Sequence, residues 1–217
     1  MPTLRSQVIR LAHKEPTLRP YLLPLLKTSS GDPFQELDAN TADALRAFTV
    51  SLAYWMGNSR GINVKEAMKV WRSSPTLRKW LARYANDNIG PLYYGGKVDR
   101  AEDLPTVGST FSKNFNVLHW SRKRKVSEWF AGLPSAVITK PSWTGGYLAE
   151  ATSVPVKEIV ADLAGLSKVC RSHPDSYRAI QPHSEAVGMF LSNVADGEME
   201  VLTTNRVTGK VIEARLF

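Results

Sequence analysis

The spacing of apolar residues changes at about residue 90, and this change constrains the fold more than any other feature of the sequence. Before it, apolar side chains recur every three or four residues, as they do on the buried face of an α-helix. After Pro91, short runs of β-prone residues alternate with turn residues. The chain is therefore predicted to be an α+β protein, with a helical region over residues 1–90 and a strand-rich domain over residues 91–217.

Three apolar stripes mark the helices expected before residue 90, and we expect them to form core rather than a ligand site. They comprise Leu45, Phe48, Leu52 and Trp55; Val64, Met68 and Trp71; and Leu77, Leu81 and Tyr84. Asn63 precedes Glu66 by three residues, as in a capping box, and Ser74 precedes a proline that suits the first helical position. Two of the helices are therefore expected to begin just after Asn63 and Ser74.

Five strands and two helices are expected after Pro91. The strands are expected at residues 92–98, 136–139, 147–154, 198–204 and 210–217, and the helices near residues 123–131 and 156–166. Thr208-Gly209 lies between the last two strands, which predicts that these strands form a terminal hairpin.

Positive charge is concentrated in the helical region. Residues 1–90 contain 13 Lys and Arg against 7 Asp and Glu, whereas the remaining residues contain 15 against 13. The net charge of +8 favours acidic partners such as nucleic acid, although solubility alone also explains it. The run Arg122-Lys123-Arg124-Lys125 opens a predicted helix, where positive charge opposes the helix dipole. It indicates either an anionic ligand or a solvated helix face.

Several classes of protein have no support in this sequence. No apolar run approaches the ~20 residues of a transmembrane helix, and residues 1–14 lack the apolar core of a signal peptide. Cys170 is the only cysteine, so no internal disulfide is possible, and the four histidines have no spacing typical of a zinc site. We therefore expect a protein of a reducing compartment such as the cytoplasm, with no bound metal and no membrane partner.

The segment that ends in Glu198-Met199-Glu200 is the most informative for chemistry. In a strand, residues two apart project to the same face, so Glu198 and Glu200 would lie side by side while Met199 and Val201 enter the core. Two adjacent carboxylates repel each other unless a cation, a proton or a polar ligand lies between them. The pair is therefore either a ligand site or the solvated face of an edge strand.

Three blocks of residues, in this order, resemble the motifs of the ADP-ribosyltransferases. The first is Leu92-Tyr93-Tyr94-Gly95, which resembles a first-strand Leu-Tyr-Arg-Gly motif. The second contains Leu118-His119-Trp120-Ser121 and Phe130-Ala131, and resembles a short strand ending in Ser or Thr before a helix with a Phe-Ala pair. The third is Glu198-Met199-Glu200-Val201-Leu202, which resembles Glu-x-Glu before Val-Leu. Residues 92–202 thus resemble the arginine-serine-glutamate type of this family.

The resemblance implies a mixed, β-sandwich-like ADP-ribosyltransferase fold over residues 91–217, with NAD as co-substrate. Members of this family cleave the nicotinamide–ribose bond of NAD and transfer ADP-ribose to an acceptor. The ribose passes through an oxocarbenium-like state that a fixed carboxylate stabilises. By this resemblance Glu200 holds a ribose hydroxyl and is the catalytic carboxylate. Glu198 orients an acceptor guanidinium and helps it to lose a proton.

The resemblance also assigns NAD binding to residues of the first two blocks, namely Tyr93, Tyr94, His119, Trp120 and Ser121. A hydroxyl such as that of Ser121 would orient the catalytic carboxylate. Trp120 would stack on the nicotinamide ring or be buried in the core. The family grips an NAD phosphate with the arginine that Tyr94 replaces here. Either Lys97, Arg100 or Arg122 supplies that charge, or NAD binding is weak or lost.

Three functions therefore compete. The first is a mono-ADP-ribosyltransferase that modifies a protein acceptor, with arginine as the expected residue. The second is an inactive structural or binding protein of the same fold. Such a protein could be a component of a phage virion or a protein injected by a phage, because the short Arg-, Leu- and Pro-rich segment at residues 4–26 resembles parts of tailed-phage proteins. The third is a protein that binds nucleic acid through its basic helical half. The expected location is the cytoplasm, or the host cytoplasm or virion for a phage protein.

Overall fold

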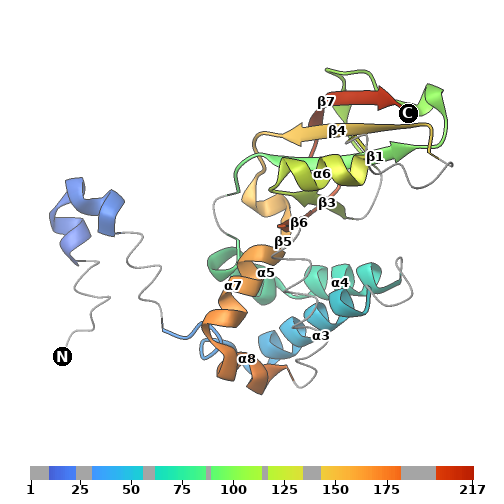
Figure 1. Cartoon of the computed structure of the whole chain (residues 1–217). Helices are drawn as coiled ribbons and strands as arrows, with labels where there is room; N and C mark the ends of the chain where they lie inside the picture. The colour runs from blue at the N-terminus through green and yellow to red at the C-terminus, as the bar shows by residue number, and fades with distance from the viewer. Residues whose placement is uncertain are drawn as a thin grey trace.

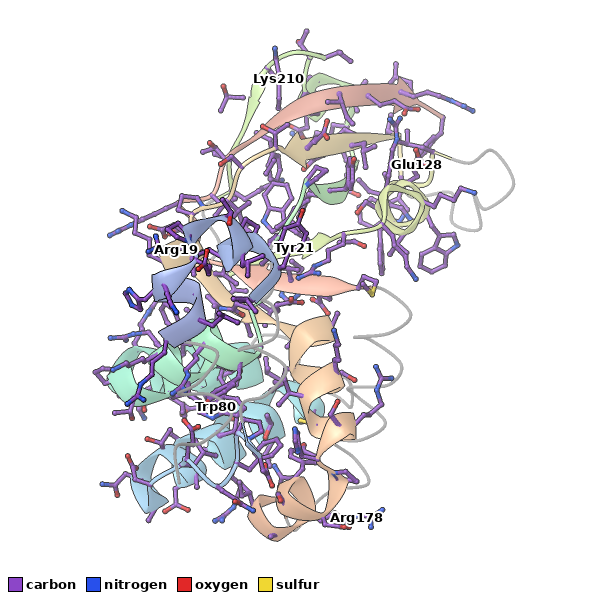
Figure 2. All side chains as sticks on the ribbon, turned by 90° about the vertical axis from the view of Figure 1, so that its left-hand side faces the viewer. Arg19, Tyr21, Trp80, Glu128, Arg178 and Lys210 are labelled. Atoms are coloured by element: carbon purple, nitrogen blue, oxygen red, sulfur yellow. The ribbon has the colours of Figure 1, made fainter. Side chains whose placement is uncertain are left out.

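The computed structural model describes residues 10–22, 31–55, 62–86, 89–113, 117–133, 143–181 and 199–217. One half is a sheet with a helix across it, and the other half is a group of helices, as Figure 1 shows. Trp80 lies in the helical half, whereas Glu128 and Lys210 lie in the sheet half (Figure 2). Across the described ranges, we find no helix with both the length and the apolar character that a membrane crossing requires.

The helical half confirms the apolar stripes of the sequence. Its helices are α3 (Ala39–Trp55), α4 (Ile62–Ser73), α5 (Pro75–Tyr84), α7 (Leu163–Ser172) and α8 (Pro174–Ile180). Phe48 and Leu52 of the first stripe, Met68 of the second, and Leu77 and Leu81 of the third are all buried. Ser74 caps α5 as expected, because its side-chain oxygen accepts a hydrogen bond of 3.2 Å from the Leu77 N–H.

The core of this half is built from both sides of residue 90. Leu163 and Leu166 of α7 are buried in the same cluster as Leu77 and Leu81 of α5. The Asn86 side-chain oxygen, just after α5, accepts a hydrogen bond of 3.0 Å from the backbone N–H of Asp162, which caps α7. The helices that precede residue 90 therefore depend on α7 and α8 to complete their core.

The strands form one curled sheet, so the α+β class is confirmed. They are β1 (Leu92–Val98), β2 (Thr110–Phe111), β3 (Leu118–Ser121), β4 (Gly145–Ala151), β5 (Ile159–Asp162), β6 (Glu200–Thr203) and β7 (Gly209–Leu216). Their order is β2-β7-β4-β1-β3-β6-β5, and every described pairing is antiparallel. A mixed, sandwich-like arrangement was expected, and the described strands instead form this single antiparallel sheet.

Different groups of side chains cover the two faces of the sheet. One face carries a cluster of aromatic rings from Tyr94, Phe111, Trp120 and Tyr147, with centroids 4.6 to 6.2 Å apart. The opposite face carries the helix α6 (Arg124–Ala131), which packs through Ala131 and the adjacent Leu133 against Leu148 of β4. The Ser127 hydroxyl of α6 also donates a hydrogen bond of 2.9 Å to the Tyr93 carbonyl of β1.

Several boundaries differ from those expected. The predicted helix at residues 156–166 is wrong, because its middle forms β5 and α7 begins only at Leu163. The predicted terminal hairpin is also wrong, because β6 pairs with β3 and β5 while β7 pairs with β4 and β2. Both β6 and β7 therefore have a neighbouring strand on each side, which leaves no free edge at which they could pair with each other. The helix expected to begin just after Asn63 begins instead at Ile62, so Asn63 lies within α4 and is not its cap. The strand expected at residues 136–139 lies outside the described residues.

Cys170 provides a test of the helical core. It is 5% exposed, and burial raises the pKa of its thiol from the ordinary 9.0 to about 12. The folded protein thus keeps the proton at pH values where the unfolded chain releases it, so stability is lost as the pH rises above 9. We expect the thiol to lower the free energy of unfolding by about 1 kcal/mol between about pH 8.5 and 10, measured by urea denaturation. Cys170→Ala should lack this contribution and keep only that of the buried tyrosines, such as Tyr147 and Tyr177, whose pKa values burial also raises. Equal losses in both proteins would contradict the burial of the thiol.

Candidate active site

Three adjacent strands bring the conspicuous residues of the sequence together. In the sheet register, Tyr93 of β1 lies opposite Ser121 of β3, and Ser121 lies opposite Glu200 of β6. Residues directly opposite each other project to the same face of a sheet. His119, two residues before Ser121, shares that face as well. Residues that are far apart in the chain therefore meet on the face that carries α6.

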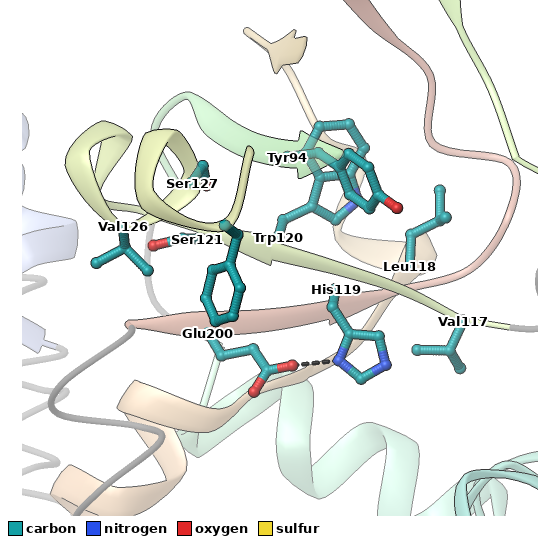
Figure 3. Close-up of a pocket in the computed structure, with 11 residues that line it drawn as sticks. Tyr94, Val117, Leu118, His119, Trp120, Ser121, Val126, Ser127 and Glu200 are labelled. Carbon is teal, nitrogen blue, oxygen red and sulfur yellow. Dashed lines mark hydrogen bonds and ion pairs between the residues drawn. The ribbon is translucent and has the colours of Figure 1, made fainter. Parts of the chain in front are cut away.

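A pocket of about 280 Å³ opens between this face and α6. His119, Ser121 and Glu200 line it from the strands, whereas Val126, Ser127 and Phe130 line it from α6. Figure 3 shows His119 and Glu200 on the same side of β3, and Val126 and Ser127 on the helix beside them. The pocket thus combines a small set of polar groups with apolar walls, as small-molecule sites usually do.

Glu200 is the most unusual group of this pocket. It is only 5% exposed, and its Oε1 contacts Nδ1 of His119 (Figure 3). Its other oxygen, Oε2, is buried and has no hydrogen-bond partner among the described residues. A buried carboxylate oxygen that lacks a donor costs free energy, typically ~1–3 kcal/mol or more for a charged group. A ligand that supplies a hydroxyl or N–H donor at this point would recover that cost.

Ser121 holds the turn between β3 and α6. Its side-chain oxygen accepts a hydrogen bond of 2.9 Å from the Lys123 backbone N–H, directly before the helix. The order of a short strand ending in serine and then a helix is therefore present as expected, with β3 ending at Ser121 and α6 beginning at Arg124. Ser121 is 6% exposed and lines the pocket beside Glu200.

Trp120 and Tyr94 also border the pocket, but their rings belong to the aromatic cluster. Figure 3 shows both rings on the side of β3 away from His119 and Glu200. Trp120 is 1% exposed, and its Nε1 donates a hydrogen bond of 3.0 Å to the Thr203 hydroxyl. Of the two roles expected for Trp120, its burial favours the core residue over a ring that stacks on a ligand.

Tyr93 lies beside α6. Burial, together with the nearby Glu150 carboxylate and a hydrogen bond to it, raises the pKa of Tyr93. The phenol therefore interacts with Glu150 of the neighbouring strand β4, its direct partner in the sheet register. The structure brings the backbone of Tyr93 next to Ser121 and engages its side chain elsewhere.

The three cations proposed to replace the missing arginine lie outside the pocket lining. Arg122 forms an ion pair with the fully buried Asp162, and its Nε is buried without a partner among the described residues. The Lys97 ammonium lies 5.9 Å from the ring centroid of Trp143, beside a second cavity. Arg100 is exposed just after β1. None of these three cations is among the described residues that line the pocket of Glu200.

The run at residues 122–125 carries less unpaired charge than its sequence implies. Besides the pair between Arg122 and Asp162, Arg124 contacts Glu128 at 2.7 Å and Glu213 at 3.2 Å. The hydrogen bond that Arg124 donates to Glu128 is the main cause that raises the pKa of Arg124. Arg122 and Arg124 thus have acidic partners within the protein.

The expected pair of glutamates is only half described, because Glu198 lies outside the described residues. The strand predicted at residues 198–204 begins instead at Glu200. Met199 has a φ of 51°, in the left-handed region that side chains other than glycine rarely adopt. The Arg122 N–H donates a hydrogen bond of 3.1 Å to the Met199 carbonyl and holds this conformation. The alternation of a regular strand therefore does not extend back through Met199.

Sequence reasoning did not assign the α6 side of the pocket to the site. Val126, Ser127 and Phe130 are spaced one, three and four residues apart, as residues on one helix face are, and this signal was present in the sequence. The ion pair of Asp162 with Arg122 was not predicted either. In the sequence, Asp162 shows only the signal of a residue that caps a helix.

The chain has no match among protein-family models, curated proteins or solved structures. Its function is therefore inferred from the pocket and the residues around it. Within the described ranges, no group of three or more His, Cys, Asp or Glu residues could hold a metal ion. What the described residues offer to a ligand is one buried carboxylate oxygen beside apolar walls.

Tyr94 allows a prediction that separates packing from ligand binding. Its pKa is raised by burial first and also by Tyr147, to which its side chain is hydrogen-bonded. We expect Tyr94→Phe to lower the free energy of unfolding by about 1 kcal/mol, the usual contribution of one hydrogen bond. Urea denaturation measures this, with Tyr21→Phe as the matched control because Tyr21 is 73% exposed. Equal stability of wild type and Tyr94→Phe would show that this hydroxyl does not contribute to the packing of the aromatic cluster.

Proposed function

We propose that the protein is a mono-ADP-ribosyltransferase with an ADP-ribosyltransferase fold over residues 91–217. It cleaves NAD at the nicotinamide–ribose bond and transfers ADP-ribose to a protein acceptor, with arginine as the expected residue. The observation that carries this proposal is the buried Oε2 of Glu200, which has no hydrogen-bond partner within the described part of the chain and lies at the wall of a pocket lined by His119 and Ser121. Each sequence block that resembles a family motif is weak alone, and the support comes from the order of the blocks along the chain. The buried carboxylate is therefore the stronger argument.

The pocket suits one end of the dinucleotide. Its volume of about 280 Å³ is near the lower limit of ~300 Å³ for small-molecule sites, so it would hold the nicotinamide–ribose end while the rest of NAD lies outside. Val126 and Phe130 supply apolar walls for a planar ring. These apolar walls also strengthen the effect of the Glu200 charge on the ribose.

The chemistry follows from the charge that develops on the ribose. When the bond between C1′ of the ribose and nicotinamide breaks, both bonding electrons leave with the nicotinamide, and the ribose becomes cationic. Glu200, hydrogen-bonded to a ribose hydroxyl through Oε2, stabilises that positive charge. A guanidinium nitrogen of the acceptor then bonds to C1′ and releases one proton. By the family resemblance, the base that receives this proton is Glu198.

The test is to incubate the purified protein with NAD that carries one label in the nicotinamide and another in the adenine. We expect free labelled nicotinamide, and transfer of the adenine label to an arginine-containing protein but not to the same protein with its arginines replaced by lysine. Release of nicotinamide without transfer would remove the arginine acceptor from the proposal. Absence of any release would remove the proposal itself.

A second candidate is an inactive protein of the same fold that binds a nucleotide without turnover. The observation that favours it is that Lys97, Arg100 and Arg122 are not among the described residues that line the pocket. None of these three residues thus adds positive charge to the pocket itself. Isothermal titration with NAD separates the candidates, since heat of binding without release of nicotinamide would support the inactive protein.

A further inference from the structure

We propose that His119 is a positioning residue for Glu200: it binds one oxygen of the carboxylate and thereby fixes the direction of the other. This role rests on the proposed function, in which Glu200 acts on the ribose of NAD. It concerns a side chain that the family resemblance places only in the wall of the NAD pocket. The contact between Nδ1 of His119 and Oε1 of Glu200 is the observation behind it (Figure 3).

The sheet register explains why these two side chains meet. Ser121 lies directly opposite Glu200, and His119 lies opposite Leu202, so His119 and Glu200 are diagonal neighbours on one face. Diagonal neighbours in a sheet are within reach when one side chain is long or aromatic. The His119 side chain is 32% exposed, whereas that of Glu200 is 7% exposed. The imidazole therefore covers one side of a carboxylate that is otherwise enclosed.

The chemistry of the contact fixes where the hydrogen lies. A carboxylate oxygen can only accept a hydrogen bond, so Nδ1 of His119 must carry the hydrogen, in the neutral ring as well as in the cationic one. Such hydrogen bonds to a charged acceptor are stronger than those between neutral groups. The contact with Glu200 thus selects one of the two tautomers of the neutral imidazole.

Fixing one oxygen has a consequence for the other. The last torsion of a glutamate side chain is broad, so the carboxylate of an isolated glutamate turns with little resistance. With Oε1 bound to His119, this rotation is restricted, and Oε2 keeps one direction inside the pocket. A catalytic charge is most effective when it is already oriented before the reaction begins. His119 would therefore act on the rate of NAD cleavage through Glu200.

Two amide variants test the role of Nδ1 specifically. The amide nitrogen of asparagine occupies nearly the position of Nδ1, whereas that of glutamine lies closer to the position of Nε2. We expect His119→Ala and His119→Gln to lower kcat for nicotinamide release by ~10- to 100-fold with little change in KM, since the lost contact matters most in the transition state. His119→Asn should recover at least about tenfold of that loss. Glutamine is closer to histidine in volume, so a packing role predicts the opposite order.

A double-variant cycle tests whether His119 acts through Glu200. In a Glu200→Gln background, His119→Gln should cost less than about threefold, because the group that it positions is already gone. Losses that multiply, or equal rates of the Asn and Gln variants, would overturn the positioning role while leaving the proposed function intact. Absence of nicotinamide release from the wild-type protein would overturn the proposed function, and the role of His119 in it as well.

Discussion

Glu200→Gln is expected to lower the rate of nicotinamide release from NAD by about 100- to 1,000-fold. This is the usual cost of removing one group that stabilises charge in a transition state. Glutamine keeps the size of the side chain and removes the negative charge that would face the cationic ribose. The charge is also effective in this place because Glu200 is 5% exposed and borders apolar walls. Steady-state release of labelled nicotinamide measures the effect.

The matched control is Glu213→Gln. Glu213 lies on β7 with a side chain that is 41% exposed, and it contacts Arg124 rather than the pocket. The same change of charge at this position should leave the rate within about twofold, because exposed ion pairs contribute little. Equal rates for wild type and Glu200→Gln would remove Glu200 from the reaction. A matching loss in Glu213→Gln would show that the total charge of the protein, and not the pocket, controls the rate.

Gly95→Ala is expected to lower the free energy of unfolding by about 3 kcal/mol or more. A Cβ atom at Gly95 of β1 would collide with the Ser127 carbonyl oxygen of α6 and lie only 2.9 Å from the Ala131 nitrogen. Both obstacles are backbone atoms, so the helix itself must move away from the sheet, and overpacking of this kind costs typically ~1–3 kcal/mol and sometimes more. For a chain of this length the melting temperature should fall by roughly 6 to 12 °C.

The effect on the pocket should follow the effect on stability. Because Val126 and Phe130 of α6 line the pocket, a shift of the helix should also reduce NAD cleavage. Gly90→Ala is the matched control, since a Cβ there meets nothing within 4 Å. That variant should melt within about 2 °C of wild type, because surface substitutions usually change stability by less than about 0.5 kcal/mol. A Gly95→Ala protein as stable as wild type would show that α6 does not pack this closely.

The elements that the sequence predicted are those with one clear period or boundary signal. The strand at residues 92–98 matches β1 residue for residue, since Gly90-Pro91 marks its start. Ser74 and the apolar stripe of α5 likewise gave the start and the buried face of that helix. Both signals are local, so they can be read without knowledge of the partner elements.

The elements that were missed depend on contacts far away in the chain. All four residues of β5 are buried, so the strand shows neither the period of a helix nor that of a half-buried strand. The hairpin failed for a related reason, because a turn sequence predicts a reversal of the chain but not which strand lies on each side. Met199 turns the chain out of the strand before Glu200, and no residue type in that segment signals this.

Only part of the candidate site was predicted, and the rest was missed because it also depends on contacts between distant residues. Glu200 and Ser121 were singled out from the sequence, and the structure brings them opposite each other. The contact between His119 and Glu200 spans 81 residues and depends on the register of β3 against β6. Register is set by the whole buried face of a sheet, so a single sequence does not reveal it.

The shared core of the helical half has a consequence for synthesis on the ribosome. Helices α3, α4 and α5 emerge from the exit tunnel well before α7 and α8, whose Leu163, Leu166 and Tyr177 complete their packing. The early helices must therefore wait with apolar surface uncovered, which is the situation in which nascent chains aggregate or recruit chaperones. Helices α3, α4 and α5 are consequently expected to complete their folding late, together with α7 and α8, which leave the ribosome after most strands of the sheet.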